Sequence, residues 1–161
     1  MAGDIFEELP LFRDLTTEQI QLLRPMFISY GCHSGTILFE QGAPAEHLYL
    51  VADGEVTIRY KPDDGPPIVI ARIRSGGVVG WSAALGNRFY TSAAICSDCA
   101  QLVRVRTRDL RYLCEVYPDT GILILDRLAS VIAERLLHTH DQVMELLLHG
   151  MRNGSLSIKE V

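Results

Sequence analysis

Residues 76–94 combine glycines, a helix-starting serine and small side chains in an order that suits phosphate binding. Two valines lead into Gly80, and Ser82 is followed by Ala-Ala-Leu, which is typical of a helix that begins at a serine cap. Gly86-Asn87 ends this helix after one or two turns. Because N–H groups at a helix start attract anions, and glycine lets a ligand approach the backbone, the stretch predicts an anion site.

The same stretch resembles the phosphate-binding cassette of the cyclic nucleotide-binding domain family. That family includes catabolite activator and FNR-type regulators, regulatory subunits of kinases and gated channels. Its cassette reads Gly-Glu-aliphatic-Ala-Leu and, after a variable gap, Arg-Ser/Thr-Ala; here the two parts read GWSAAL at 80–85 and YTSA at 90–93. The resemblance implies a ligand-binding set of Gly80, Trp81, Ser82, Ala83, Arg88, Tyr90, Thr91 and Ser92.

The sequence departs from the family at the two positions whose side chains matter most for binding a cyclic nucleotide. Trp81 stands in place of the glutamate that holds the ribose hydroxyl, and Tyr90 stands in place of the arginine that pairs with the cyclic phosphate. Hydrogen bonds to charged groups contribute about 1.5–3 kcal/mol each, so losing both contacts costs about two to four decades of affinity. The resemblance therefore implies weak binding of cyclic AMP or cyclic GMP, or another small anionic ligand.

The side chains around this departure each have two interpretations. Arg88 faces the same side as Tyr90 if the chain is extended, but Gly86-Asn87 favours a turn with Arg88 as a solvated loop residue. Trp81 either fills the pocket mouth or packs under the last helix, or it forms a stacking wall for a planar or apolar ligand. Tyr90 can do either, with its hydroxyl as a hydrogen-bonding group.

From Phe27 onward the apolar period changes to two. Short β-prone runs separated by turn residues predict an antiparallel double-stranded β-helix, or jelly roll, with an N-terminal helix and a long C-terminal helix. Phe39-Glu40-Gln41-Gly42 and residues 49–56 are similar to the family's strand–turn phrases, and the resemblance covers residues 11–137. The expected strands are 27–30, 36–39, 47–51, 55–60, 68–73, 91–95 and 101–105, with Thr16 or Thr17 capping the first helix.

Length and composition set the broader class. The chain has 161 residues and a net charge of −5, which favours one domain: residues 1–151, with the β-roll at 27–106, helices at 108–150 and a tail at 152–161. No Lys/Arg cluster is evident, which argues against nucleic acid, and no apolar run reaches membrane length. The four cysteines suit free thiols in a cytoplasmic protein; Cys96 and Cys99 would face each other only if Ser97-Asp98 forms a hairpin turn.

The segment after Pro118 predicts one long helix with an apolar seam. Its seam positions recur at steps of four and three residues, with Thr139 as the polar member. Left uncovered, such a stripe would be a large apolar patch, so the pattern predicts a homodimer; the alternative is a helix that folds back on its own domain. The seam residues are Leu125, Ala129, Ile132, Leu136, Val143 and Leu146.

Two hypotheses follow for function. The first is a non-enzymatic ligand-sensing regulatory module that transmits occupancy of the cassette to the last helix and so to an effector protein. The second is an interaction or dimerisation subunit that keeps the fold but has lost ligand binding. No Ser/His/Asp order, paired-carboxylate motif or Walker loop indicates an enzyme, and no ligand set indicates a metal site.

Overall fold

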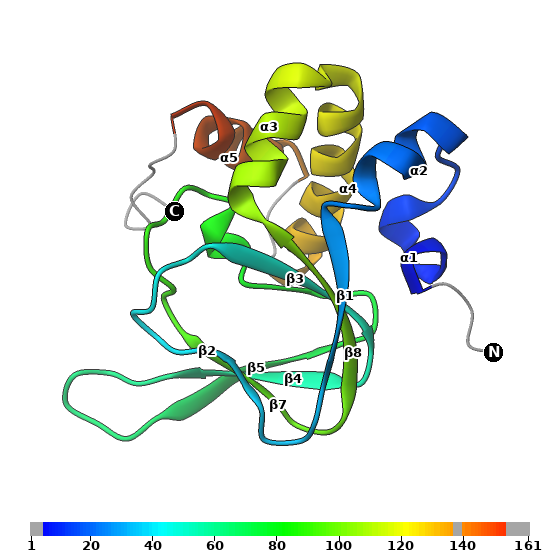
Figure 1. Ribbon diagram of the computed structural model, residues 1–161. Coiled ribbons are helices and arrows are strands. Elements are labelled where there is room, and N and C mark those ends of the chain that lie inside the picture. The colour runs from blue at the N-terminus through cyan, green and yellow to red at the C-terminus, as the bar shows by residue number, and fades with distance from the viewer. Residues whose placement is uncertain (1–4, 137–139, 154–161) are drawn as a thin grey trace.

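The computed structural model describes residues 5–136 and 140–153, and it places helices at one end of a roll of two antiparallel sheets (Figure 1). The first sheet has the order β1-β8-β3-β6, with β1 at Phe27–Cys32, β8 at Ala100–Arg106, β3 at His47–Asp53 and β6 at Val78–Val79. The second has the order β2-β7-β4-β5, with β2 at Ile37–Phe39, β7 at Ala93–Cys96, β4 at Glu55–Tyr60 and β5 at Ile68–Arg74.

The connections show why these strands form a roll. Among the described strands, only the β4–β5 connection stays within one sheet, and every other one crosses to the opposite sheet. This winding confirms the predicted β-roll with flanking helices. The short strand β6 was not predicted, because two valines between glycines carry too little pattern.

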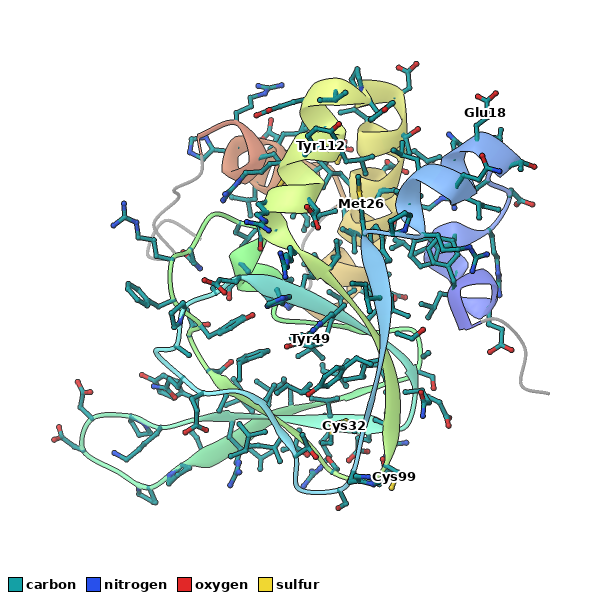
Figure 2. All side chains as sticks on the ribbon, viewed as in Figure 1. Glu18, Met26, Cys32, Tyr49, Cys99 and Tyr112 are labelled. Carbon is teal, nitrogen blue, oxygen red and sulfur yellow. A yellow bond between two sulfur atoms is a disulfide. The ribbon has the colours of Figure 1, made fainter. Side chains whose placement is uncertain are left out.

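Strand β3 is apolar on both faces because it lies between two cores. Leu48 and Leu50 point to the helices, whereas Tyr49 and Val51 point into the roll, as alternation along a strand requires. Figure 2 shows Tyr49 inside the roll, between the two sheets. The residues of β3 are apolar in a continuous run because both faces of the strand are buried. In β4, apolar and polar residues alternate.

The N-terminal elements cover the helical end of the first sheet. They are α1 at Ile5–Glu8, the 3₁₀ helix η1 at Pro10–Phe12, and α2 at Thr17–Leu23. Thr16 caps α2: its hydroxyl accepts from the Gln19 N–H, while the Gln19 side chain accepts from the Thr16 N–H. Phe6, Phe12 and Phe27 form an aromatic cluster that fastens this segment to β1.

The C-terminal region contains α3 at Thr107–Val116, α4 at Pro118–Leu136 and α5 at His140–Asn153, so the single long helix predicted after Pro118 is wrong. His140 Nε2 lies 2.8 Å from Asp126 Oδ1. A continuous helix would separate these residues by about 21 Å, so the chain has turned back. The predicted tail at 152–161 falls mainly outside the described residues, as does Thr139.

The proposed dimer seam belongs to the chain's own core. Leu125, Ala129 and Val143 are 0% exposed and Ile132 is 1% exposed, and Leu146 packs against the same cluster. The side chain of Leu136 lies outside the described part. The two helices and the roll cover the described seam residues, so these residues give no support to a homodimer, which stays a prediction. None of the helices in the described ranges could cross a bilayer.

The cysteines also differ from the prediction. Cys32 of β1 and Cys96 of β7 form a disulfide that joins the two sheets, while Cys99 and Cys114 are free. Strands β7 and β8 lie in different sheets, so residues 97–99 are a crossing between sheets rather than a hairpin turn. The sequence offered no spacing signal for this pair, because the two cysteines are 64 residues apart.

This disulfide gives a direct test of the roll. Unfolded but unreduced protein should show two reactive thiols, and four after reduction, when assayed with a chromogenic thiol reagent. Reduction should lower the free energy of unfolding by about 2–4 kcal/mol, because the closed loop is long. Cys99→Ser is the control, and it should remove one thiol without changing stability. Four thiols before reduction would contradict the bridge.

Candidate ligand site in the cassette

The cassette begins at a glycine that no other residue could replace without strain. Gly80 has a φ of 79°, in the left-handed region, and it caps the 3₁₀ helix η2 at Trp81–Ala83. A methyl group on Gly80 would lie 3.2 Å from the His47 carbonyl oxygen and 3.3 Å from the rings of Phe39 and Tyr90. The predicted cap at Ser82 is therefore wrong: Gly80 is the cap, and Ser82 lies inside η2.

A cavity of about 260 Å³ opens beside this turn. It gathers five of the predicted ligand-binding residues, Gly80, Trp81, Ser82, Thr91 and Ser92, but not Ala83, Arg88 or Tyr90. Its other walls are apolar side chains of β2, β4, β5 and β6, and none of the described residues that line it is charged. The cavity can therefore hold an apolar body and offer hydroxyl and backbone groups at one end.

Tyr90 is part of the core rather than of the cavity. Its ring stacks on Phe39 with centroids 3.6 Å apart. Its hydroxyl donates to the His47 carbonyl oxygen at 2.6 Å and accepts from the His47 N–H at 3.1 Å. Burial raises the pKa of Tyr90 to about 12. Tyr90 thus ties the cassette to the start of β3.

Thr91 and Ser92 line the cavity, whereas Tyr90, to which the resemblance assigned the position of the arginine, is 5% exposed and packs in the core. The chain bends at Thr91 and Ser92, just before β7 begins. Arg88 is exposed and does not line the cavity; its carbonyl oxygen accepts from the Ala45 N–H. The structure thus places Arg88 in the loop, and within the described part of the chain no arginine lines the cassette cavity.

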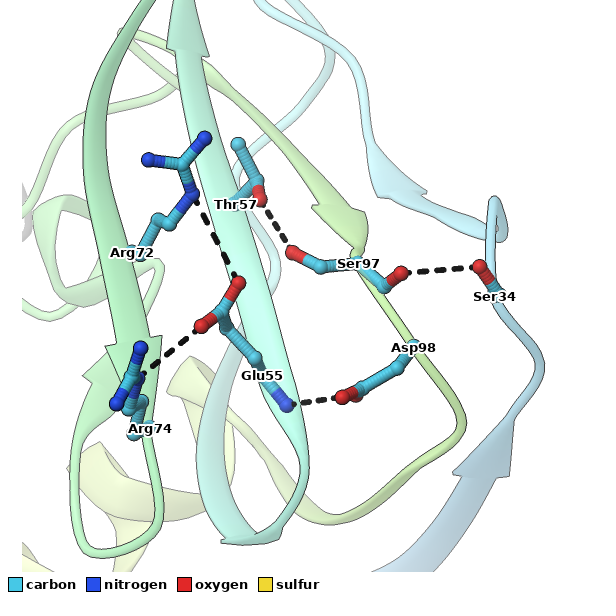
Figure 3. Close-up of polar contacts among 7 residues, drawn as sticks. All are labelled: Ser34, Glu55, Thr57, Arg72, Arg74, Ser97 and Asp98. Atoms are coloured by element: carbon cyan, nitrogen blue, oxygen red, sulfur yellow. Dashed lines mark hydrogen bonds and ion pairs between the residues drawn. The ribbon is translucent and has the colours of Figure 1, made fainter.

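Trp81 stands between two hollows. It lines the cassette cavity and also a cavity of about 440 Å³ whose other walls include Val131 and Ile132 of α4. Arg72 and Arg74 border this second cavity, but both lie close to Glu55, at 3.8 and 3.1 Å (Figure 3). Trp81 therefore combines the two predicted roles, packing toward a helix and walling the pocket.

The residues after η2 press directly on the last helix. A methyl group on Gly150 of α5 would lie 2.6 Å from the Ala84 carbonyl oxygen and 2.7 Å from the Leu85 carbonyl carbon. Ala84 and Leu85 are buried in the same cluster as Val143 and other apolar residues of α5. The cassette and α5 are thus in backbone-level contact, which the sequence did not indicate.

One further group of residues escaped the sequence analysis. Arg106, Arg108 and Arg111 line a cavity of about 390 Å³ with Glu46 and His47. The expectation that the chain has no Lys/Arg cluster is therefore wrong. The signal in the sequence was the close spacing of arginines at 104, 106, 108 and 111. The net charge of −5 describes the whole chain and does not reveal this local excess of positive charge.

Comparison with known proteins agrees with this architecture. The cyclic nucleotide-binding domain family matches residues 32–117, more than half of the chain, and the chain belongs to this family. The cAMP-activated global transcriptional regulator CRP of Salmonella typhimurium is 29% identical over 126 residues, covering 74% of this chain and 58% of the regulator. The chain therefore spans less than two thirds of that relative.

Solved structures show the same fold at lower identity. A cyclic nucleotide-binding domain from Methylobacillus flagellatus aligns with a TM-score of 0.71 and 20% identity, covering 88% of this chain and 79% of the other. A cyclic nucleotide-binding protein from Geobacter metallireducens aligns with a TM-score of 0.67 and 22% identity, covering 80% of this chain and 92% of the other.

The Tyr90 contact predicts a pH-dependent stability. Tyr90→Phe should lower the free energy of unfolding by about 1–3 kcal/mol, because the buried His47 backbone groups lose their partner. Because folding raises the pKa of Tyr90, its contribution is complete below about pH 10 and is lost as the pH rises toward about 12. Denaturant titrations of both proteins from pH 7 to 11 measure the difference. A constant difference across that range would contradict the assignment.

The contact with α5 predicts a steric cost. Gly150→Ala should lower the free energy of unfolding by about 1–3 kcal/mol, because the added methyl group meets backbone atoms that cannot move alone. Glu145→Ala, an exposed position on the same helix, is the control and should have little effect. Equal stability of the two variants would show that α5 does not lie against Ala84 and Leu85.

Proposed function

We propose that this chain is a ligand-sensing regulatory domain that transmits occupancy of the cassette cavity to helix α5. The observation that carries the proposal is the contact between the cassette and α5. The η2 turn forms one wall of the cavity, and the residues that follow it, Ala84 and Leu85, meet Gly150. A ligand that shifts η2 must therefore shift α5 or break this packing.

The chemistry of the cavity favours a ligand with an apolar or planar body and few charges. Trp81 and the neighbouring aliphatic side chains supply dispersion contacts, while Ser82, Thr91 and Ser92 supply hydroxyl groups. A cyclic phosphate would find no guanidinium on the walls. Cyclic AMP and cyclic GMP are therefore expected to bind with dissociation constants of about tens of micromolar or weaker.

Transmission requires that the ligand distinguish two positions of α5. A ligand shifts such an equilibrium only by the difference between its affinities for the two states. Trp81 is suited to create this difference, because it touches the ligand cavity on one side and the cavity under α4 on the other. A ligand that stacks on its ring would change how the helices pack on the roll.

The uncharged cavity also supports a second candidate, an interaction subunit without a small ligand. A homodimer of such a subunit would need a surface other than the predicted seam, because the described seam residues other than Leu146 are fully buried in the chain's own core. The two candidates differ in one measurable respect, which is whether any small molecule stabilises the protein through the cassette.

A gain-of-function variant tests the assignment of the cavity. Thr91→Arg should raise the affinity for cyclic AMP by about 10- to 100-fold, because it places a guanidinium on the wall that lacks one. Isothermal titration calorimetry measures the affinity, and the emission of Trp81, the only tryptophan, reports whether the ligand reaches the cassette. Phe89→Arg adds the same charge at an exposed position outside the cavity and is the control.

Two results would contradict this scheme. Sub-micromolar binding of cyclic AMP to the unaltered protein would show that another group supplies the missing phosphate contact. An equal gain in Thr91→Arg and Phe89→Arg would show that net charge, rather than this cavity, controls the binding. A thermal-shift screen of nucleotides and metabolites that finds only ligands leaving Trp81 emission unchanged would favour the second candidate.

A further inference from the structure

The cavity lined by arginines, here called the arginine cavity, lies where β3, β8 and α3 meet. Its volume is about 390 Å³, and its walls include Glu46, His47, Arg106, Arg108 and Arg111. It shares no lining residue with the cassette cavity. A ligand in this cavity would therefore contact none of the residues that line the cassette cavity.

The fold brings these arginines together from two elements. His47 pairs with Arg106 across the antiparallel strands β3 and β8. The next residue, Thr107, donates its N–H and its hydroxyl to the Glu46 carbonyl oxygen at 3.0 and 3.2 Å, which holds the start of α3 against β3. Arg108 and Arg111 are three residues apart on α3, so they share one face of that helix.

The guanidinium groups of this cavity lack anionic partners. Among the described residues, no ion pair joins Arg106, Arg108 or Arg111 to a carboxylate, whereas Arg72 and Arg74 elsewhere lie close to Glu55. The Nε–H of Arg111 is buried without a hydrogen-bond acceptor. A buried donor without an acceptor is costly, and such atoms are rare in folded proteins.

The electrostatic balance around the cavity is positive. Glu46 is the one carboxylate among its lining residues, and it is exposed to solvent. Burial and the charges of Arg104 and Arg106 lower the pKa of His47, which favours a neutral imidazole. Glu46 and Asp109 oppose this shift, so two carboxylates act on His47, but three guanidinium groups line the cavity against the single carboxylate of Glu46. This excess of positive charge favours an anion.

We propose that this cavity binds the phosphoryl group of a small phosphorylated molecule through Arg106, Arg108 and Arg111. Planar guanidinium groups match phosphate oxygens in pairs, and several together select a dianion over a neutral ligand. The first turn of α3 adds N–H groups beyond that of Thr107, which already donates to Glu46, because its cap residue, Arg106, provides no side-chain hydrogen bond. The volume leaves room for more than the phosphoryl group itself.

Calorimetric titrations with inorganic phosphate, pyrophosphate and succinate at constant ionic strength test the proposal. Both phosphates should bind at one saturable site, and succinate should bind at least tenfold more weakly. Arg108→Gln and Arg111→Gln should each reduce phosphate affinity by about tenfold or more. Arg13→Gln removes the same charge from an exposed position outside the cavity and should leave the affinity unchanged.

Each alternative outcome overturns the assignment. If phosphate does not saturate on the unaltered protein, the cavity has no such ligand. If Arg13→Gln weakens binding as much as Arg108→Gln, the effect is general attraction to positive charge. Preferred binding of succinate would overturn the phosphoryl class. Because Arg108 is exposed, its variant keeps the test informative even if Arg111→Gln does not fold.

Discussion

The hydroxyl of Tyr90 on the backbone of His47 is the contact on which both cavities depend. It closes the cassette against the start of β3 with two hydrogen bonds, while stacking on Phe39 buries the ring. The same close packing leaves space only for glycine at position 80. Because His47 also pairs with Arg106 and lines the arginine cavity, one residue joins the two polar regions. A shift of Tyr90 would therefore also move His47 and its strand partner Arg106.

Charge is distributed unevenly between these regions. Tyr90, which stands where the family has a phosphate-binding arginine, is in the core, and the described residues that line the cassette cavity carry no charge. At the junction of β8 and α3, by contrast, three arginines line the arginine cavity, and none of them forms an ion pair with a described carboxylate. Arg106 and Arg108 are exposed to solvent, whereas the Nε–H of Arg111 is buried without an acceptor, so this donor is the one that carries a desolvation cost.

The helical layer shows how a ligand could act at a distance. Gly150 allows α5 to approach the backbone of Ala84, so the contact is between main chains rather than flexible side chains. Main-chain contacts transmit small shifts because neither side can adapt by changing rotamer. The described seam residues pack in the core that α4 and α5 share with the roll, and their burial explains the apolar pattern without a second subunit.

The sequence by itself determined the fold class, a cap for α2 at Thr16 or Thr17 and the place of the cassette, because turn glycines, strand alternation and capping residues are local signals. The structure then chose Thr16 as the cap. Tertiary structure alone decided that Tyr90 lies in the core while Thr91 lines the cavity, since the partners of Tyr90, Phe39 and His47, are more than 40 residues away in the chain. It also decided that the apolar seam is internal, because a helix pair folded on itself and a coiled coil share the same three-and-four spacing. The Cys32–Cys96 bridge and the arginine cavity depend on residues far apart in the chain, which only the closed roll brings together.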